Sequence, residues 1–409
     1  MTEILINHIN PVASNRFTRE IPRKEKLRQS NYLDRFDLNS LFYDVAVYKN
    51  KLMFIAPPIY KQTSIFSLAK VYINGILLTQ EPVFVHEWKV ARISYYLTDD
   101  MINMINCYDN IKVTFDCGYI NQTINVKVHS HEFLKNSNVI IAINQDNDLQ
   151  RIKDWLKWNV EINGFDSAII FDNDSKTYNV NDFNSSFFNI EGLNHLLVIN
   201  YPVKFGPLNF VKDGERSGFD SDYAQYVDLA IARFKYCGKS STFSSCDIDE
   251  YMYSKTDTRL VDAVKQTIGG YIPVSGFLVD NIFNHPVGNL VGLRAKDFKY
   301  VNRNTVTKVG MKKYIVDLSK IPENMQLWLH GIDMFRKGYE KYETPSNELG
   351  VEVGGRPNVD YSDEFTGAHF KGLGANWRNN GRNKIYLYKD STDEKIPERL
   401  DKFIYDVYE

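Results

Sequence analysis

The pattern of apolar residues changes near Asn136, and this change constrains the fold more than any other feature of the chain. Residues 139–143 (VIIAI) form a continuous apolar run, which is typical of a strand buried on both faces of a parallel sheet. Apolar residues at helical spacing follow over residues 148–163, and Gly164 then favours a helix end. A second apolar run occupies residues 167–171 (SAIIF). This order predicts a β-α-β unit, the building block of a parallel sheet.

Segments of the same kind follow this unit. Residues 195–200 (HLLVIN) and 241–246 (STFSSC) are typical of further strands, and a helix is expected between them over residues 221–236. Strands that alternate with helices form parallel sheets. We therefore predict an α/β domain with a mixed, mostly parallel sheet over residues 136–409.

The first third of the chain has a different pattern. Seven short runs between residues 40 and 133 are rich in β-branched and aromatic residues and are separated by turn-forming residues. Strands at this spacing predict a β-sandwich, which we assign to an N-terminal domain of residues 1–135. His129 and His131 would share one face of a strand. Because no third ligand is evident, we expect them at a surface or an edge strand rather than on a metal.

Charge and composition limit the partners. The chain of 409 residues carries 49 Lys and Arg against 51 Asp and Glu, so its formal net charge is −2. A nearly neutral chain has no general attraction to nucleic acid, and we expect no such partner. The N-terminus lacks the apolar core of a signal peptide, and no stretch reaches the roughly 20 apolar residues of a membrane span. We therefore expect a cytoplasmic protein. The basic run at residues 19–28 (REIPRKEKLR) would permit peripheral membrane contact, although we expect a solvated arm.

An acidic string follows the strand expected at residues 241–246. Asp247, Asp249 and Glu250 place three carboxylates within four residues, where they repel one another unless a cation lies between them. Hard divalent cations take oxygen ligands, and such a cation stabilises the charge that develops on a departing diphosphate. We expect Asp247 and Asp249 to hold Mn²⁺ or Mg²⁺ on the diphosphate of a nucleotide substrate. The alternative is a solvated acidic turn.

A second polar turn follows the apolar run at residues 167–171. Because the carboxyl ends of parallel strands meet at one edge of a sheet, this turn should lie at the same edge as the acidic string. Asp172 would accept a hydrogen bond from a base or a ribose hydroxyl, and Asn173 and Ser175 would complete a polar rim. We count Asp172, Asn173 and Asp174 as nucleotide-binding candidates. The alternative is an Asx-rich turn that only ends the strand.

Several short motifs occur in a characteristic order. They are Asp154–Trp158 (DWLKW), Gly164-Phe165, the turn Asp172–Ser175, Gln225 within DYAQYVDLAIARF, and Asp247–Tyr251 (DIDEY), followed by Lys313–Val316 (KYIV), His330-Gly331 and His369-Phe370. In this order they resemble the bacterial glycosyltransferase-2-like proteins that are related to glycosyltransferase family 92. The resemblance covers roughly residues 136–390.

This resemblance implies a GT-A fold, which is a Rossmann-like nucleotide-sugar domain. It implies a nucleotide-diphosphate sugar as donor, with a UDP-sugar favoured, and a glycan acceptor of a polysaccharide, lipopolysaccharide or glycoprotein. It also implies that His369 is a third metal ligand and that basic residues after it, including Lys371 and Arg378, face the diphosphate. The alternative is a structural histidine beside a solvated basic loop. The chain departs from the family at residues 144–147 (NQDN) and 272–278 (IPVSGFL), so the resemblance identifies neither the acceptor nor the catalytic base.

The catalytic base and the enzyme class have open alternatives. An inverting transferase needs a carboxylate within about 3 Å of the acceptor hydroxyl. Asp280 is the candidate and Glu250 the alternative, whereas a retaining enzyme needs neither. A nucleotidyltransferase acting on sugar phosphates is a second class, but residues 142–148 lack the Gly-rich loop that it normally has. A non-catalytic glycan-binding protein with a degenerate transferase domain is a third, and the intact acidic string argues against it.

Overall fold

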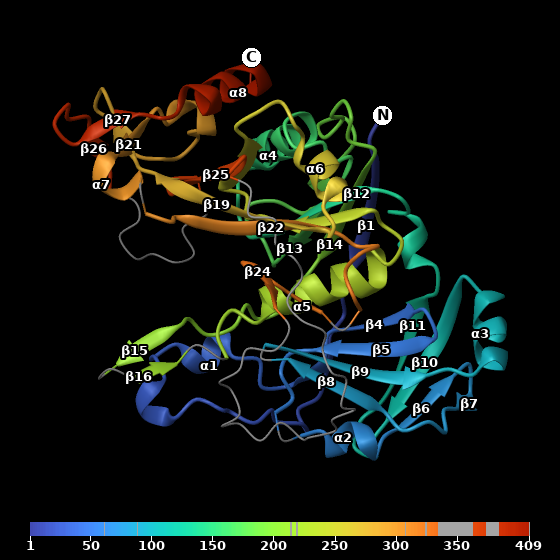
Figure 1. Ribbon diagram of the computed structural model, residues 1–409. Coiled ribbons are helices and arrows are strands. Elements are labelled where there is room, and N and C mark those ends of the chain that lie inside the picture. Colours follow the sequence, from blue (N-terminus) through green and yellow to red (C-terminus); the bar gives the residue numbers. More distant parts are fainter. Residues whose placement is uncertain are drawn as a thin grey trace.

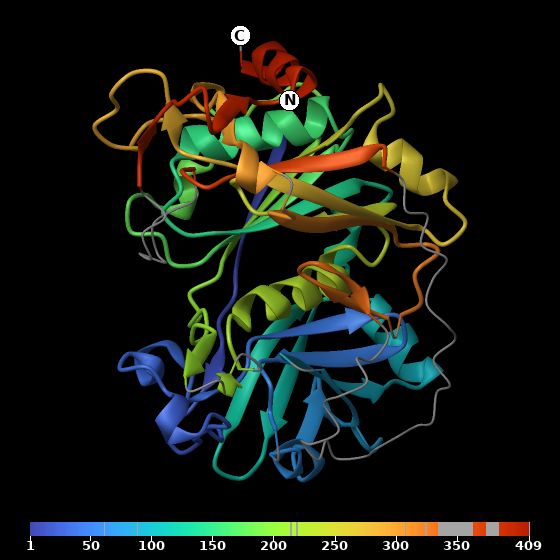
Figure 2. The same ribbon diagram turned by 60° about the vertical axis from the view of Figure 1, so that its left-hand side comes forward.

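The protein has two parts that lie on either side of one helix. The computed structural model describes residues 1–60, 62–87, 89–212, 215–217, 220–306, 308–323, 325–333, 363–373 and 384–408. One part is a large mixed sheet with helices on its faces, and the other consists mainly of two antiparallel sheets. Helix α5 (Ala224–Ile231) lies between them in both views (Figure 1 and Figure 2).

The large sheet has nine strands in the order β1-β14-β13-β12-β17-β22-β19-β25-β18. Five of its eight neighbouring pairs are parallel, including the run from β1 to β17, whereas β22 and β18 are antiparallel to their neighbours. The strands are β1 (Glu3–His8), β12 (Asn138–Asn144), β13 (Ser167–Asp172), β14 (His195–Asn200), β17 (Thr242–Ser245), β18 (Glu250–Ser254), β19 (Tyr271–Val279), β22 (Met311–Asp317) and β25 (Phe365–Phe370). This confirms the predicted α/β domain with a mixed, mostly parallel sheet.

Helices cover both faces of this sheet. On one face, α4 (Leu149–Glu161) and α6 (Leu260–Gln266) share an apolar core with the strands, in which Trp155 is fully buried. On the other face, α5 and the π-helix η4 (Ala232–Tyr236) belong to a separate core. At the C-terminus, α8 (Glu398–Tyr408) packs against α4. The sheet is therefore buried between two layers, as a run of parallel strands requires.

The predicted β-α-β unit is present as β12, α4 and β13. The side chain of Asp148 caps the start of α4 by accepting from the Gln150 N–H at 2.8 Å. Gly164 lies just past the helix end at φ +83°, and a Cβ at this position would come within 2.7 Å of the Val261 side chain. Glycine therefore meets two requirements at this position, a left-handed backbone conformation and close contact with α6.

The first strand departs from the predicted domain boundary. β1 forms one edge of the large sheet and runs parallel to β14, with Glu3 beside His195 and His8 beside Asn200. Residues 3–8 therefore belong to the large sheet rather than to an N-terminal domain of residues 1–135. The short run of residues 3–8 gives no local indication that its partner strand is β14, which lies far along the chain.

Two antiparallel four-stranded sheets form most of the N-terminal part, in the orders β4-β5-β9-β8 and β11-β10-β6-β7. Their strands are β4 (Asp44–Tyr48), β5 (Lys51–Ala56), β6 (Lys70–Ile73), β7 (Ile76–Leu77), β8 (Val83–Glu87), β9 (Val90–Tyr96), β10 (Asn110–Asp116) and β11 (Asn121–Lys127). Each of the seven predicted runs overlaps one of these strands. Residues of both sheets share one apolar core, in which the Phe54 and Phe115 rings meet edge to face with their centroids 5.7 Å apart.

The remaining elements are short. The helices are η1 (Glu25–Leu27), α1 (Tyr32–Arg35), α2 (Ser64–Ser67), α3 (Asp99–Asn106), η2 (Ser130–Glu132), η3 (Val180–Asp182), η5 (Ala295–Asp297) and α7 (Arg303–Val306). The strands are β2 (Val12–Ala13), β3 (Ser40–Phe42), β15 (Phe210–Lys212), β16 (Glu215–Ser217), β20 (Ile282–Phe283), β21 (Tyr300–Asn302), β23 (Gln326–Trp328), β24 (Gly331–Asp333), β26 (Tyr386–Leu387) and β27 (Asp393–Lys395). None of the described helices combines the length and the apolar character that a membrane crossing requires.

Two arginines of the basic run at residues 19–28 are folded into the protein. Arg19 and Arg23 are each 1% exposed. Arg19 donates to the Pro58 carbonyl at 2.6 Å and to other backbone carbonyls, and Arg23 forms a buried ion pair with Asp220. A guanidinium held inside the fold meets neither solvent nor a membrane surface. For these two arginines, the solvated arm expected from the sequence is wrong, and neither is free for the membrane contact that the run would permit.

Helix α5 joins the two parts of the protein. All of its residues are buried, as expected for a helix that is surrounded by other elements. Its core includes Tyr43, just before β4, and Met53 of β5 together with Ile141 and Ile169 from the large sheet. A chain that began at residue 136 would therefore lack β1 and one side of this core.

Candidate functional site

The acidic string forms a tight turn between β17 and β18. The Glu250 N–H donates to the Asp247 carbonyl at 3.0 Å, and a side-chain oxygen of Glu250 accepts from the Asp247 N–H at 3.1 Å. Backbone and side chain thus close the turn from both ends. Because β17 is parallel to β12 and β12 is parallel to β13, the turn leaves the sheet at the edge where those strands end.

Lys313 on β22 lies against this turn. Its ammonium is 2.8 Å from a carboxylate oxygen of Glu250 and 3.1 Å from one of Asp247, and its side chain is 1% exposed. The Asp247 side chain, in contrast, is 39% exposed. A fixed cation of the protein thus balances two of the three carboxylates. The sequence placed Lys313 only within a family motif and assigned it no role, because its partners are distant along the chain.

These contacts shift the pKa values of the three groups. Burial raises the pKa of Glu250 to about 7, although the charge of Lys313 opposes this shift. Burial would also raise the pKa of Asp247, but the charge and hydrogen bond of Lys313, together with the charges of His369 and His330, outweigh it and lower that pKa below its ordinary value. Burial would lower the pKa of Lys313, but Asp247 and Glu250 raise it well above its ordinary value. Lys313 therefore carries its charge at neutral pH.

Asp249 faces His369 of β25. The His369 Nε2 atom is 3.4 Å from a carboxylate oxygen of Asp249, and Nδ1 is 3.2 Å from the Gly310 carbonyl oxygen. The Phe370 N–H donates to the Asp249 carbonyl at 2.8 Å, which keeps the two segments in register. Burial disfavours a charged imidazole, but the Asp249 carboxylate outweighs it and raises the pKa of His369 to about 9.

Asp249 and His369 fit a divalent cation in chemistry and in spacing. Two ligands about 2.1 Å from an octahedral cation lie about 3 Å apart, close to the separation of this pair. When the Gly310 carbonyl accepts the Nδ1 proton of His369, Nε2 is left to bind the cation. This is the usual arrangement of a metal-bound imidazole. Asp247 is tied to Lys313 instead. Across the described part of the chain, no group of three or more His, Cys, Asp or Glu side chains is assembled for a metal. Of the predicted set, only Asp249 and His369 are brought face to face.

The second polar turn is hydrogen-bonded internally. Asp172, at the end of β13, is 3% exposed and accepts from the Asn144 side-chain amide at 2.7 Å and from the Ser175 hydroxyl at 2.6 Å. Burial raises the pKa of Asp172, although these hydrogen bonds oppose the shift. Asp172 therefore ties the end of β12 to the turn after β13.

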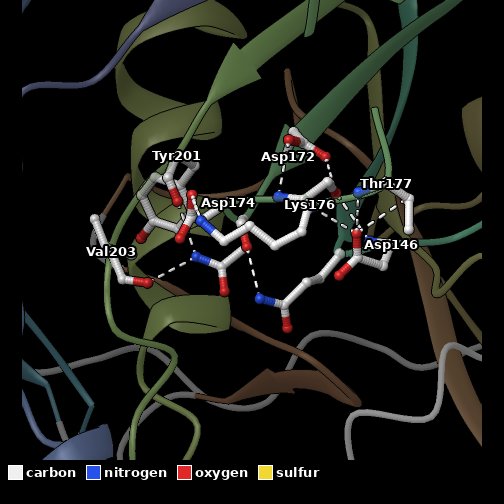
Figure 3. A network of polar contacts seen from close by, with 10 residues as sticks. Asp146, Asp172, Asp174, Lys176, Thr177, Tyr201 and Val203 are labelled. Carbon is white, nitrogen blue, oxygen red and sulfur yellow. Dashed lines mark hydrogen bonds and ion pairs between the residues drawn. The ribbon is translucent and has the colours of Figure 1, made fainter. Parts of the chain in front are cut away.

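The neighbours of Asp172 differ in their exposure and in their polar contacts, some of which Figure 3 shows. Asn173 is 2% exposed, and its side-chain amide donates to the carbonyls of Tyr201 and Val203, both at 2.8 Å. Asp174 is exposed and forms an ion pair with Lys176 at 2.6 Å. Asn173 thus shapes the turn from inside, whereas Asp174 faces solvent.

Asp146 joins the loop after β12 to the same turn. Its carboxylate accepts from the backbone N–H of Lys176 at 2.6 Å and of Thr177 at 2.9 Å, and from the Thr177 hydroxyl at 3.0 Å (Figure 3). Burial opposes ionisation, but these hydrogen bonds lower the pKa of Asp146. Asp146 and Asp174 both have positive φ, at 54° and 61°. No sequence pattern identifies Asp146, because an aspartate in a loop is common.

The predicted base Asp280 lies just after β19 and is largely buried. One of its oxygens is 3.0 Å from the Lys371 ammonium, and the other accepts from the Thr305 hydroxyl at 2.9 Å. A predicted base and a predicted diphosphate ligand thus contact each other.

Arg378 lies outside the described residues. His330 is close enough to Lys313 to feel its charge: burial, together with that charge, lowers the pKa of His330.

Arg151 on α4 is a further residue that sequence patterns did not indicate. Its three guanidinium nitrogens donate to the carbonyls of Leu290, Leu293 and Leu373 at 2.8, 2.9 and 3.0 Å. Leu373 lies shortly after His369, so this arginine fastens the segment that leaves β25 to the helix. No local periodicity identifies such a clamp, because its acceptors lie in two distant segments, the loop of Leu290 and Leu293 and the segment after β25.

No known protein-family model matches the chain, and no curated protein matches it. What the site does therefore follows from its own geometry.

Proposed function

We propose that the chain is a metal-dependent glycosyltransferase of the GT-A type. It transfers a sugar from a nucleotide-diphosphate sugar, with a UDP-sugar favoured, to a glycan acceptor. The observation that carries this proposal is the Asp249–His369 pair beside the turn that Lys313 balances, at the carboxyl edge of parallel strands. Open α/β sheets bind their ligands at this edge. Carboxylate and imidazole ligands there suit Mn²⁺ or Mg²⁺.

In this proposal, Asp249 and His369 hold the cation. When bound, the cation supplies positive charge to the diphosphate that departs as the glycosidic bond breaks. The Gly310 carbonyl orients His369 so that Nε2 faces Asp249. A Cβ on Gly310 would come within 2.6 Å of the Leu278 nitrogen, so glycine allows this segment to approach β19 and reach the imidazole.

The turns after β12 and β13 receive the nucleoside in this account. Asp172 and Asn173 are buried and hydrogen-bonded to the protein, so they support the proposal by fixing the shape of the edge. The exposed groups at the same edge, Asp174 and Lys176, are better placed to meet a ligand. We therefore assign nucleoside contact to the exposed side of the turn.

The two candidate bases, Glu250 and Asp280, have different contacts, and these contacts distinguish their roles. Glu250 is engaged by Lys313 and by the Asp247 N–H, which suits a structural role in the turn. Asp280 is held by Lys371 and Thr305, which would orient its carboxylate. Asp280 is therefore the base of an inverting reaction in this proposal, and a retaining reaction would leave it without that role.

A thermal-shift experiment with UDP and GDP tests the proposal. UDP with Mn²⁺ should raise the Tm of the full chain, because a ligand at 100 times its Kd stabilises the folded state by about 2.7 kcal/mol. Asp249→Ala should remove the part of the shift that requires Mn²⁺. Asp262→Asn is the matched control, since Asp262 is an exposed carboxylate at the start of α6. The proposal fails if neither nucleotide stabilises the protein with any divalent cation, or if Asp249→Ala responds as the wild type does.

A further inference from the structure

The acidic turn is divided into two halves with different partners. Asp247 and Glu250 share the ammonium of Lys313, whereas Asp249 faces the imidazole of His369. Lys313 is almost fully buried, so it supports the turn from behind and does not reach a substrate. The two halves therefore differ in the charge that balances them.

We infer that Lys313 keeps Asp247 from binding a free divalent cation, so that the cation enters the site together with the nucleotide diphosphate. This inference rests on the proposed function. The geometry that supports it is the contact of 3.1 Å between the Lys313 ammonium and the Asp247 carboxylate, which occupies one oxygen of a predicted metal ligand.

Two physical effects follow from this contact. An octahedral cation prefers six oxygen or nitrogen ligands, and Asp249 with His369 supplies two, so a free ion would keep most of its water. The fixed charge of Lys313 also repels a divalent ion nearby. A diphosphate offsets both effects, because it brings oxygen ligands and negative charge. Lys313 thus acts as a positioning residue that makes the binding of metal and nucleotide cooperative.

The test measures the free Mn²⁺ signal by electron paramagnetic resonance during titrations of the full chain, with and without UDP. In the wild type, UDP should tighten Mn²⁺ binding at least about tenfold, within the usual range of coupling between sites. Lys313→Met/Glu250→Gln removes the cation and one carboxylate together. Replacing both members of a buried pair by neutral groups of similar volume is usually tolerated. This variant releases Asp247, so it should bind Mn²⁺ alone at least about fivefold tighter and show weaker coupling to UDP.

Lys235→Met is the matched control. Lys235 on η4 forms a largely buried ion pair with Asp44 at 2.7 Å, in contact with the N-terminal sheets rather than with the acidic turn. This substitution should lower stability and leave both Mn²⁺ titrations unchanged.

Three results would overturn the inference. The first is a wild type that binds Mn²⁺ equally tightly with and without UDP, and this result does not depend on any variant folding. The second is a double variant that binds Mn²⁺ no tighter than the wild type. The third is a control, Lys235→Met, that changes the titrations as much as the double variant does. If no combination of Mn²⁺ and nucleotide binds to the wild type, the proposed function itself fails, which distinguishes the two ideas.

Discussion

The turn after β13 and the turn after β17 leave the same edge of the sheet and both contain aspartates, but they stabilise them differently. After β13, Asp172 is buried and accepts hydrogen bonds from neutral side chains. After β17, Asp247 is balanced by the charge of Lys313, and Asp249 faces His369. One turn is held largely by hydrogen bonds from neutral donors to carboxylates, and the other by opposed charges.

This difference indicates which turn is better suited to bind a charged ligand. A hydrogen-bonded network fixes shape, because removing one partner leaves a buried group unsatisfied. A turn of opposed charges responds strongly to an added cation or anion, because the interaction between charges is large where water is excluded. We therefore expect the shape of this edge to depend on the β13 turn, and the binding of metal and diphosphate to depend on the β17 turn.

The largest effect on stability should come from the charge of Lys313. Lys313→Met leaves the carboxylates of Asp247 and Glu250 without their buried partner, which should lower the free energy of unfolding by about 3–5 kcal/mol. Urea denaturation at pH 7 in the presence of a chelator measures this loss. A loss below about 1 kcal/mol would mean that the turn does not depend on charge balance, and the contrast between the turns would disappear.

The next largest effect should be a pH dependence of the free energy of unfolding that arises at the β17 turn. The folded pKa of His369 is raised to about 9, above the ordinary 6.5, so its protonated form stabilises the fold. This contribution is fully present below about pH 6.5 and is lost as the pH rises through 9, and it amounts to on the order of 3 kcal/mol. Chemical denaturation at pH 6.5 and 9.5 with a chelator should show this loss in the wild type and a smaller loss in His369→Gln. Equal pH dependence in both proteins would refute the assignment.

A smaller effect should follow the removal of an interior amide from the β13 turn. Asn173→Ala leaves the buried carbonyls of Tyr201 and Val203 without a donor, which should lower the free energy of unfolding by about 2 kcal/mol. Asp174→Asn, at the exposed neighbouring position, should change it by less than about 0.5 kcal/mol. If the two variants lose the same stability, the interior network does not fix the shape of this edge.

The smallest effect concerns Asp146. Asp146→Asn should lower the free energy of unfolding by under about 1 kcal/mol at pH 7, because the hydrogen bonds from Lys176 and Thr177 lose the acceptor charge in a partly exposed site. The folded pKa of Asp146 is lowered, so its contribution is present above the ordinary value of 3.8 and is lost as the pH falls below it. The difference between variant and wild type should therefore vanish in acid. A difference that persists at pH 2 would exclude a charge effect.

Local patterns predicted the parts of the fold that depend on neighbouring residues. The run of residues 139–143 and the helix that follows it became β12 and α4, because burial on both sides and helical periodicity are visible in a short window. The pairing of β1 with β14 was not predictable, because it joins segments far apart in the chain. Arg19 and Arg23 were misassigned for the same reason, since their buried partners are distant.

The same contrast between local and distant partners applies to the candidate site. The acidic string was found because Asp247, Asp249 and Glu250 are adjacent in sequence. The pairing of Asp249 with His369 was suggested only by a family resemblance, and its geometry follows from the register of β18 and β25. The role of Lys313 was missed, because a lysine in a strand has no local feature that identifies its counter-ions. Charge balance inside a fold is a property of the tertiary structure.

The most direct test of the central claim is the release of UDP from a UDP-sugar by the full chain, with and without Mn²⁺, in the wild type and in Asp249→Ala. Water can replace a missing acceptor, so a transferase site should release UDP slowly even without its glycan. We expect release that depends on Mn²⁺ in the wild type and falls at least about a hundredfold in the variant, as loss of a group that stabilises developing charge does. Release that is unaffected by a chelator and equal in both proteins would contradict a metal-dependent site at the β17 turn.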